Sequence, residues 1–382
     1  MTDDSDPDKR NAGEPEHHER APGVWDLGEI ASQFAVDGKF CQAVPYGGGH
    51  INETYCSTFD RACTPVRIIL QRINTHVFLD PHALMENIER VTRHLAMRLA
   101  DEADRERRAL TLIPDRAGHS LYVDPQGDCW RAYRFIEGAR TYDTVASARQ
   151  AWEGARAFGR FLELLADLPA PRLHDTIPGF HDAPKRFAAL EEAVARDAAG
   201  RSRACEPEIA FAFARKQMTR SILDAGLPER VTHNDTKINN VLFDLVSGEA
   251  ICVVDLETVM PGFAAYDFGD LVRSATCAAP EDERDLNKVT MRFDLFEALA
   301  RGYFGSAGCL LTRAEKESLV TGGKLITLVM GIRFLTDFLN GDTYYKVHRA
   351  DHNLDRCRVQ FKLLESIEAQ EHAMERLIGD LG

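Results

Sequence analysis

The chain has 382 residues, a length that suits two lobes or two domains better than one small core. Its 46 Lys and Arg residues against 60 Asp and Glu give a formal net charge of −14, which disfavours nucleic-acid binding through the phosphates. Apolar residues make up 44% of the chain, enough for a sizeable core, and no apolar run approaches the roughly 20 residues of a membrane helix. We therefore expect a folded, acidic protein with neither a nucleic-acid nor a membrane partner.

Residues 1–24 are polar and rich in charge, Pro and Gly, which predicts a disordered acidic tail. Acidic residues such as Asp3 and Asp4 stand where a secretory signal would carry basic ones. The nine cysteines are scattered and form no C-x-x-C pair, so neither a disulfide framework nor a thiolate zinc site is indicated. A reduced, cytoplasmic location is the expectation.

Residues 25–136 predict a β-rich N-terminal lobe. A short helix is expected over 25–34 and a longer one over 81–99, with Leu84, Ile88, Val91 and Leu95 on one face. β-branched and aromatic runs separated by turn residues predict strands that enter 45–50 and span 52–59, 66–73, 121–123 and 130–136.

After a connector at 134–140, residues 137–382 predict a larger, mainly helical C-terminal lobe. Helices are expected over 147–166, 184–198, 206–225, 288–303, 312–340 and 353–378, with one β-rich stretch over 230–256. The fold class is therefore α+β.

The segment 231–244 carries the pattern H-x-D-x-x-x-x-N as His233, Asp235 and Asn240, and a second apolar strand ends in Asp255. Two carboxylates and one carboxamide at strand ends suit phosphoryl transfer. Asp235 could accept the proton of an attacking hydroxyl, and Asn240 and Asp255 are hard oxygen donors for Mg²⁺ on ATP phosphates. His233 is expected to prop the loop.

The chain resembles the aminoglycoside phosphotransferase / choline kinase superfamily, and within it the N-acetylhexosamine 1-kinases. The matching blocks lie at 45–52, 69–74, 130–138, 233–243, 255–262 and 335–342. The resemblance implies a protein-kinase-like two-lobed fold with an antiparallel sheet in the small lobe and with ATP and Mg²⁺ as cofactors.

Three features are predicted to contact the nucleotide. Gly47, Gly48 and Gly49 precede a strand, and glycines let backbone N–H groups approach phosphates closely. The resemblance implies that a strand cation contacts phosphates. Arg72 is the candidate because this strand has no lysine, and its acidic partner stays open between Glu86 and Glu89. The resemblance also implies that the connector, including Phe135 and Glu137, presents backbone groups to adenine.

The predicted acceptor is a sugar hydroxyl near Asp235. In the resembled subfamily a loop histidine, an arginine and a tyrosine contact the hexosamine, which implies His50, Arg333 and Tyr344 here. The segment 331–349 balances basic and acidic residues and does not suit a polycation. The expected reaction turns the anomeric hydroxyl of an N-acetylhexosamine into a sugar 1-phosphate.

Two alternatives stay open: a kinase of the same fold for another sugar or an amino alcohol, of the aminoglycoside, choline or homoserine type, and a non-catalytic nucleotide-binding module. The oligomeric state is not indicated.

Two further motifs are interpreted as structural. Asp267-Phe268-Gly269 spells a protein-kinase metal motif, but it lies 32 residues after Asp235, whereas Asp255 lies 20 after it and ends a strand. Asp267 is therefore predicted to cap the next helix. Gly322-Gly323-Lys324 has no following Ser or Thr and no preceding strand, so a helix is predicted there instead of a phosphate loop.

Overall fold

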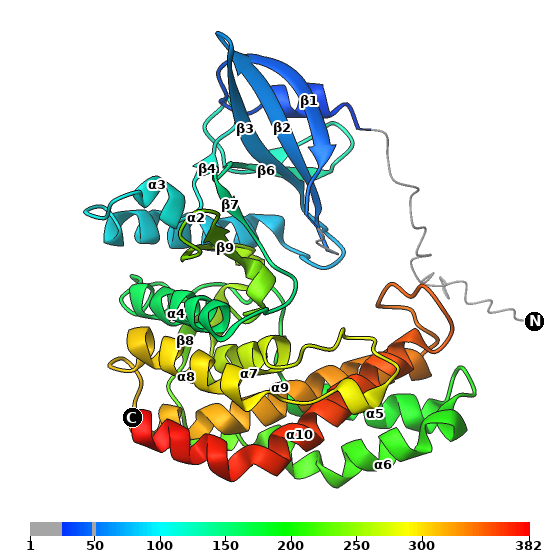
Figure 1. Cartoon of the computed structure of the whole chain (residues 1–382). Helices are drawn as coiled ribbons and strands as arrows, with labels where there is room; N and C mark the ends of the chain where they lie inside the picture. The colour runs from blue at the N-terminus through cyan, green and yellow to red at the C-terminus, as the bar shows by residue number, and fades with distance from the viewer. Residues whose placement is uncertain (1–24, 48–50) are drawn as a thin grey trace, which may run out of the picture.

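The computed structural model describes residues 25–47 and 51–382, so the predicted tail over 1–24 lies outside the described residues. A sheet forms one end of the molecule, and helices form most of the other end (Figure 1). This is the predicted protein-kinase-like arrangement of a β-rich N-terminal lobe and a helical C-terminal lobe.

The N-terminal lobe is built on an antiparallel sheet with the strand order β1-β2-β3-β6-β4, and β5 also pairs with β6. The strands are β1 (Lys39–Pro45), β2 (Glu53–Arg61), β3 (Thr64–Arg72), β4 (Leu112–Ile113), β5 (Tyr122–Val123) and β6 (Cys129–Arg134). Because side chains alternate along each strand, the two faces of this sheet carry different residues. On β6, Trp130 and Ala132 face one way while Arg131 and Tyr133 face the other.

Two helices cover these faces. Helix α1 (Leu27–Ser32) packs on the face that carries Ile68, Leu70 and Trp130. Helix α2 (Pro81–Arg98) buries its predicted apolar face, from Leu84 to Leu95, in a core cluster that continues into the C-terminal lobe. The two lobes therefore share one hydrophobic core around α2.

The C-terminal lobe consists of helices around short strands. The helices are α4 (Ala148–Leu164), α5 (Ala183–Arg196), α6 (Glu206–Ala214), α7 (Ala264–Ala275), α8 (Phe293–Ala307), α9 (Arg313–Leu339) and α10 (His352–Leu381). Strands β7 (Ala139–Arg140), β9 (Val241–Asp244) and β10 (Ala250–Val253) form one small sheet, and β8 (Arg230–Thr232) pairs with β11 (Met260–Gly262). The long helices α9 and α10 run side by side (Figure 1).

The prediction of one helix over 206–225 is wrong. Helix α6 ends at Ala214, and two short 3₁₀ helices follow, Lys216–Arg220 and Leu223–Ala225. The composition favours helix throughout, but Arg215 leaves the α-helical conformation, with φ of −107° and ψ of 11°, and the chain continues in tighter 3₁₀ turns. The sequence patterns also missed the short elements β4, β7 and α3 (Arg105–Arg108).

The Gly322-Gly323 pair lies inside α9, as predicted. A Cβ atom on Gly322 would lie 2.0 Å from the carbonyl oxygen of Ala265 in α7, and one on Gly269 would lie 2.4 Å from the carbonyl oxygen of Gly322. The glycines therefore allow α7 and α9 to cross in backbone contact. Helix α9 is long and apolar enough to pass a compositional test for a membrane span, but 72% of its most apolar window is buried, which is typical of a core helix.

Candidate active site

The catalytic-loop candidate Asp235 lies between β8 and a 3₁₀ helix formed by Ile238–Asn240. One carboxylate oxygen forms an ion pair with Lys237 Nζ at 2.8 Å, and the other accepts a hydrogen bond from Asn240 Nδ2 at 3.0 Å. Asn240 also donates to the carbonyl oxygen of Asp235 at 2.8 Å. Both side-chain oxygens of Asp235 are thus held in fixed directions.

The buried side chains of Asp267 and His233 hold this loop in place. The Asp267 carboxylate accepts hydrogen bonds from the backbone N–H groups of His233, at 2.9 Å, and Asn234, at 2.7 Å. His233 donates from Nε2 to the carbonyl oxygen of Val254 at 2.9 Å, so its Nδ1 is left to accept from the N–H of Asp235. The structural interpretation of Asp267 and His233 holds, but the prediction that Asp267 caps a helix is wrong. Helix α7 begins after Phe263, so Asp267 lies inside it.

Asp255 lies two residues after the end of β10 and adopts a left-handed backbone with a φ of 63°. Asn234, beside Asp235, has a φ of 64°. Non-glycine residues pay about 1–3 kcal/mol for such conformations, which persist where the surrounding structure fixes them and which cluster at functional sites. The backbone N–H of Val254 donates to the carbonyl oxygen of Asn240 at 2.9 Å, so the end of β10 is fastened to the loop that holds Asp235.

The two carboxylates have opposite pKa shifts. Burial acts to raise the pKa of Asp235, but the Lys237 ammonium, together with His233 and Arg273, outweighs burial and lowers that pKa to about 2. The pKa of Asp255 is raised, first because nearby protein atoms desolvate the carboxylate and then because of the negative charge of Asp235. The second cause shows that the two carboxylates lie within electrostatic range of each other.

The donor set fits a magnesium ion that also binds nucleotide phosphates. The Asp255 carboxylate is open to solvent and accepts no hydrogen bond from the described residues, and the Asn240 amide oxygen is likewise free. No group of three or more His, Cys, Asp or Glu side chains that could hold a metal by itself occurs in the described ranges. Mg²⁺ is commonly held by one or two carboxylates with phosphates and water completing its shell.

A buried polar network connects the lobes next to this donor set. The side chains of Arg131 on β6 and Glu257, in the turn after Asp255, form an ion pair and are only 1% and 3% exposed. Asn52 donates to Glu257 at 2.6 Å, and Arg131 donates twice to Gln71 on β3, at 3.0 and 2.9 Å. This network fixes the inner face of the N-terminal sheet against the strand end that carries Asp255.

Arg72 lies on the opposite face of the sheet from this network. It pairs with Glu53 at 3.1 Å and Asp128 at 3.0 Å, and its guanidinium lies 4.8 Å from the Trp25 ring. Glu86 and Glu89, the two candidates for its acidic partner, do not contact Arg72. Glu86 instead hydrogen-bonds to His174, and Glu89 accepts a hydrogen bond from Ser120. The phosphate role of Arg72 stays a prediction.

The start of the glycine loop lies next to the connector. The Tyr46 and Phe135 rings make an edge contact at 5.5 Å, and Gly47 adopts a left-handed φ of 79°. Glu137 pairs with Arg67, whose guanidinium also lies 4.0 Å from the Phe135 ring. The structure thus brings Gly47, Phe135 and Glu137 to one region, while Gly48, Gly49 and His50 lie outside the described residues.

The acceptor candidates Arg333 and Tyr344 come from α9 and from the loop that follows it. Arg333 has no carboxylate within ion-pair distance among the described residues, and Tyr344 is 65% exposed. The Asp337 carboxylate organises this loop by accepting hydrogen bonds from the backbone N–H groups of Thr343, Tyr344 and Tyr345. Neither side chain is thus explained by a salt bridge or by packing in the core.

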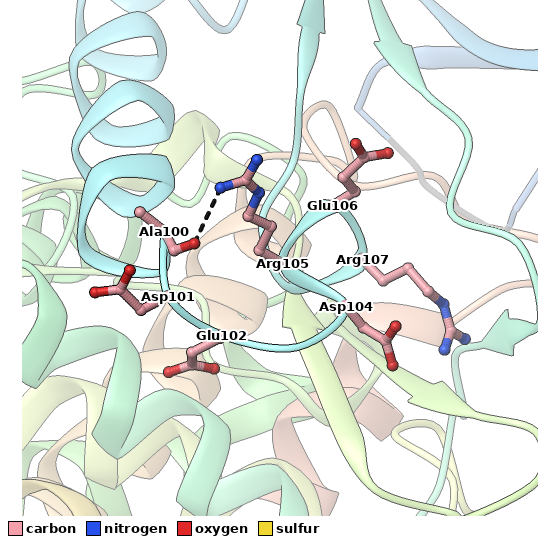
Figure 2. A pocket seen from close by; sticks show the side chains of 7 residues that line it. All are labelled: Ala100, Asp101, Glu102, Asp104, Arg105, Glu106 and Arg107. Atoms are coloured by element: carbon pink, nitrogen blue, oxygen red, sulfur yellow. Dashed lines mark hydrogen bonds between the residues drawn. The ribbon is translucent and has the colours of Figure 1, made fainter.

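The hollow shown in Figure 2 lies elsewhere, in the connection from α2 to α3, and all its lining residues come from 100–107. Arg105 donates there to the carbonyl oxygen of Ala100 at 3.0 Å. Arg107 reaches the connector, where it donates to the carbonyl oxygens of Glu137 and Gly138. None of the candidate site residues lines this hollow, and the charged side chains Glu102, Glu106 and Arg107 form ion pairs with residues outside it.

A comparison with known families matches residues 42–302 to the phosphotransferase enzyme family. The chain belongs to this family. The matched region contains the loop with Asp235 and Asn240, the strand end with Asp255 and the connector. Family membership makes the chain a nucleotide-dependent small-molecule phosphotransferase.

Solved structures similar to this phosphotransferase share its fold. A microcompartment-associated aminopropanol kinase is 16% identical, with a TM-score of 0.58, and the match covers 91% of this chain and 98% of that one. The ethanolamine kinase of Plasmodium vivax is 14% identical, with a TM-score of 0.52 and coverage of 88% and 84%. A spectinomycin phosphotransferase in complex with ADP and spectinomycin is 12% identical, with a TM-score of 0.53 and coverage of 90% and 97%.

The sequence patterns overlooked several residues of this site. Lys237, two residues after Asp235, could have been found from its position in the same loop. Arg131 and Glu257 stand in the blocks that carry the resemblance, and a charged residue in the middle of an apolar strand is itself an indication of a buried pair. His181 has no such indication, because only the fold brings it to the carbonyl oxygen of Asn234, at 2.8 Å.

Proposed function

We propose that this phosphotransferase uses ATP and Mg²⁺ to phosphorylate the anomeric hydroxyl of an N-acetylhexosamine, of the GlcNAc or GalNAc type, to give the sugar 1-phosphate. The observation that carries the proposal is the placing of Asp235, Asn240 and Asp255 together: Asn240 donates to the Asp235 carboxylate, and the backbone N–H of Val254, the residue before Asp255, donates to the carbonyl oxygen of Asn240. Among small-molecule kinases, the longer resemblance blocks favour the N-acetylhexosamine type.

The proposal assigns the nucleotide to the N-terminal lobe and the connector. Gly47, Gly48 and Gly49 would offer backbone N–H groups to phosphates, and the backbone at Phe135 and Glu137 would bind adenine. Arg72 would have to leave Glu53 and Asp128 to reach a phosphate. Asn240 and Asp255 would hold the Mg²⁺, which would neutralise charge that develops on the phosphates.

In the proposed reaction the sugar hydroxyl oxygen attacks the γ-phosphorus, the bond to the β–γ bridging oxygen breaks, and ADP leaves. Asp235 accepts the hydrogen bond, and finally the proton, of the hydroxyl. Its carboxylate is ionised at neutral pH, because Lys237 and the other nearby positive groups keep the pKa at about 2 in spite of burial. Lys237 and Asn240 fix the direction of the carboxylate, which suits the positioning that dominates phosphoryl-transfer catalysis.

On the acceptor side, the proposal assigns hydrogen bonds to the sugar to Arg333, Tyr344 and His50. A guanidinium donates to hydroxyl or acetamido oxygens, and an exposed tyrosine ring can stack on a sugar face. The nine cysteines are free thiols, in keeping with the proposed cytoplasmic location.

The test is a panel of hydroxylated acceptors with MgATP, read by ADP release, with N-acetylhexosamines, other sugars, ethanolamine and choline. We expect the N-acetylhexosamines to have the highest kcat/KM, and chelation of Mg²⁺ to abolish turnover. Asp235→Asn keeps the shape of the side chain and should lower kcat by at least about 10²-fold without changing the melting temperature. Near-normal turnover in this variant, or an amine as the best acceptor, would overturn the assignment.

A further inference from the structure

Two arginines of the C-terminal lobe lie together without carboxylate partners. Arg186 in α5 donates from Nη2 to the carbonyl oxygen of Phe180 at 3.2 Å, and its buried Nε has no partner. The guanidinium of Arg333 in α9 lies 5.7 Å from the Phe180 ring and 5.6 Å from the Tyr345 ring. No carboxylate of the described chain lies within ion-pair distance of either guanidinium.

The two positive charges act on each other. Burial lowers the pKa of Arg186, and the charge of Arg333 lowers it further, while Tyr345, Tyr344 and Asp182 act in the other direction. The Asp182 carboxylate is engaged as the cap of α5, where it accepts from the backbone N–H of Lys185 at 2.9 Å. A pair of neighbouring, partly buried guanidiniums without a carboxylate is unfavourable in the free protein, and such an arrangement suits a site that binds an electron-rich group.

The segment beside this pair is hydrogen-bonded to the loop that carries Asp235. His181, next to Phe180, donates from Nε2 to the carbonyl oxygen of Asn234, the residue before Asp235. Burial lowers the pKa of His181 to about 4, so this imidazole is neutral, and both Asp235 and Arg333 lie within its electrostatic range. The nucleotide candidates belong to the N-terminal lobe and the connector, whereas α5, α9 and the segment 180–182 belong to the C-terminal lobe.

We propose that Arg186 and Arg333 form a cationic acceptor subsite that binds the oxygen atoms of a neutral or anionic hydroxyl compound and rejects acceptors that carry an ammonium group. The inference rests on the proposed function and adds Arg186 as a specificity-determining residue. Guanidinium groups donate hydrogen bonds and accept none, so they match carbonyl and hydroxyl oxygens but not an ammonium group. Specificity within one fold often depends on such a repulsive element, and similar folds here include an aminopropanol and an ethanolamine kinase.

The experiment compares glucose, N-acetylglucosamine and glucosamine, which differ only at C2, at a pH below the pKa of the amine. Wild type should show a kcat/KM for glucosamine at least about tenfold below that for glucose, because a like charge at the site opposes binding. Arg186→Gln and Arg333→Gln should each reduce this ratio several-fold, while Arg186→Lys, which keeps the charge, should preserve it. Arg196→Gln is the control, because Arg196 lies exposed in the last turn of the same helix and donates to Asn340.

Melting temperatures identify a variant that is misfolded, and the two glutamine variants test the same subsite from different helices. Equal use of glucose and glucosamine by wild type, or an unchanged ratio in the folded glutamine variants, would overturn the subsite and leave the kinase assignment intact. Preference for ethanolamine or choline over every sugar would overturn both the subsite and the proposed function.

Discussion

The buried pair of Arg131 and Glu257 allows a sharp test of how the lobes are held together. Arg131→Met removes the guanidinium and leaves the Glu257 carboxylate buried with Asn52 as its one remaining hydrogen-bond donor among the described residues. It also removes both donors from the Gln71 side-chain oxygen. Because an unpaired buried charge keeps its desolvation penalty, we expect a large loss of stability.

Breaking a buried ion pair by removing one partner costs about 3–5 kcal/mol. At about 2–4 °C per kcal/mol for domains of this size, the melting temperature should fall by about 6–20 °C. Replacing both partners in Arg131→Met/Glu257→Leu removes the orphaned charge. The double variant should be more stable than Arg131→Met and should lose only about 1–3 kcal/mol for the unpaired Asn52 and Gln71 groups.

Denaturant unfolding of the two single variants and the double variant measures these differences as a mutant cycle. Arg134→Met is the matched control on the same strand, because its pair with Glu106 is exposed, with side chains 54% and 70% accessible. The control should lose less than about 1 kcal/mol. If Arg131→Met were no less stable than the control, or if the double variant lost the sum of the two single losses, the reasoning would be refuted.

Two other predictions concern the catalytic loop and the helix crossing beneath it. Asp267→Asn leaves one of two buried backbone N–H groups without its acceptor, so we expect a loss of about 1–3 kcal/mol and a lower kcat/KM, measured by unfolding and turnover. Burial raises the pKa of Asp267 from 3.8 to about 6, the backbone N–H groups and charge of His233 oppose this, and Asp270 adds to it. The folded state therefore keeps a proton that the unfolded chain releases, and wild-type stability relative to Asp267→Asn should fall by about 3 kcal/mol as pH rises from 4 to above 6. A pH-independent difference would contradict this. Gly322→Ala should cost at least about 1–3 kcal/mol because its Cβ would meet the carbonyl of Ala265, whereas Gly305→Ala in α8, with open space, should be neutral or stabilising by melting temperature.

Local pattern was sufficient for much of this fold. The apolar face of α2 was predicted from its 3.6-residue period, and each of its four residues is buried. The long helices α9 and α10 were predicted in the same way, whereas the strands of the 230–256 stretch were predicted from short apolar, β-branched runs. Segment 206–225 failed because composition alone favours helix and tertiary contacts decide where a short helix breaks.

The site shows the same limit. Asp235 and Asn240 are five residues apart, so their contact follows from the local turn. The support of the loop by Asp267 joins residues more than 30 positions apart, and the pair of Arg131 and Glu257 spans 126 positions. Those contacts depend on how α7 and the N-terminal sheet dock against the loop, which no local spacing encodes.

The low pKa of Asp235 bears on the choice of acceptor. A carboxylate with a pKa near 2 is a weak base, so it gains little by removing a proton early from an ordinary alcohol. The transition state of phosphoryl transfer is loose in most analyses, and the hydroxyl then needs alignment more than deprotonation. The anomeric hydroxyl of a sugar is a hemiacetal and is more acidic than an ordinary alcohol, so it releases its proton to a weak base most readily. In the proposed reaction, Lys237 and Asn240 fix the directions of the Asp235 oxygens while its basicity is low, which suits an anomeric hydroxyl as the acceptor.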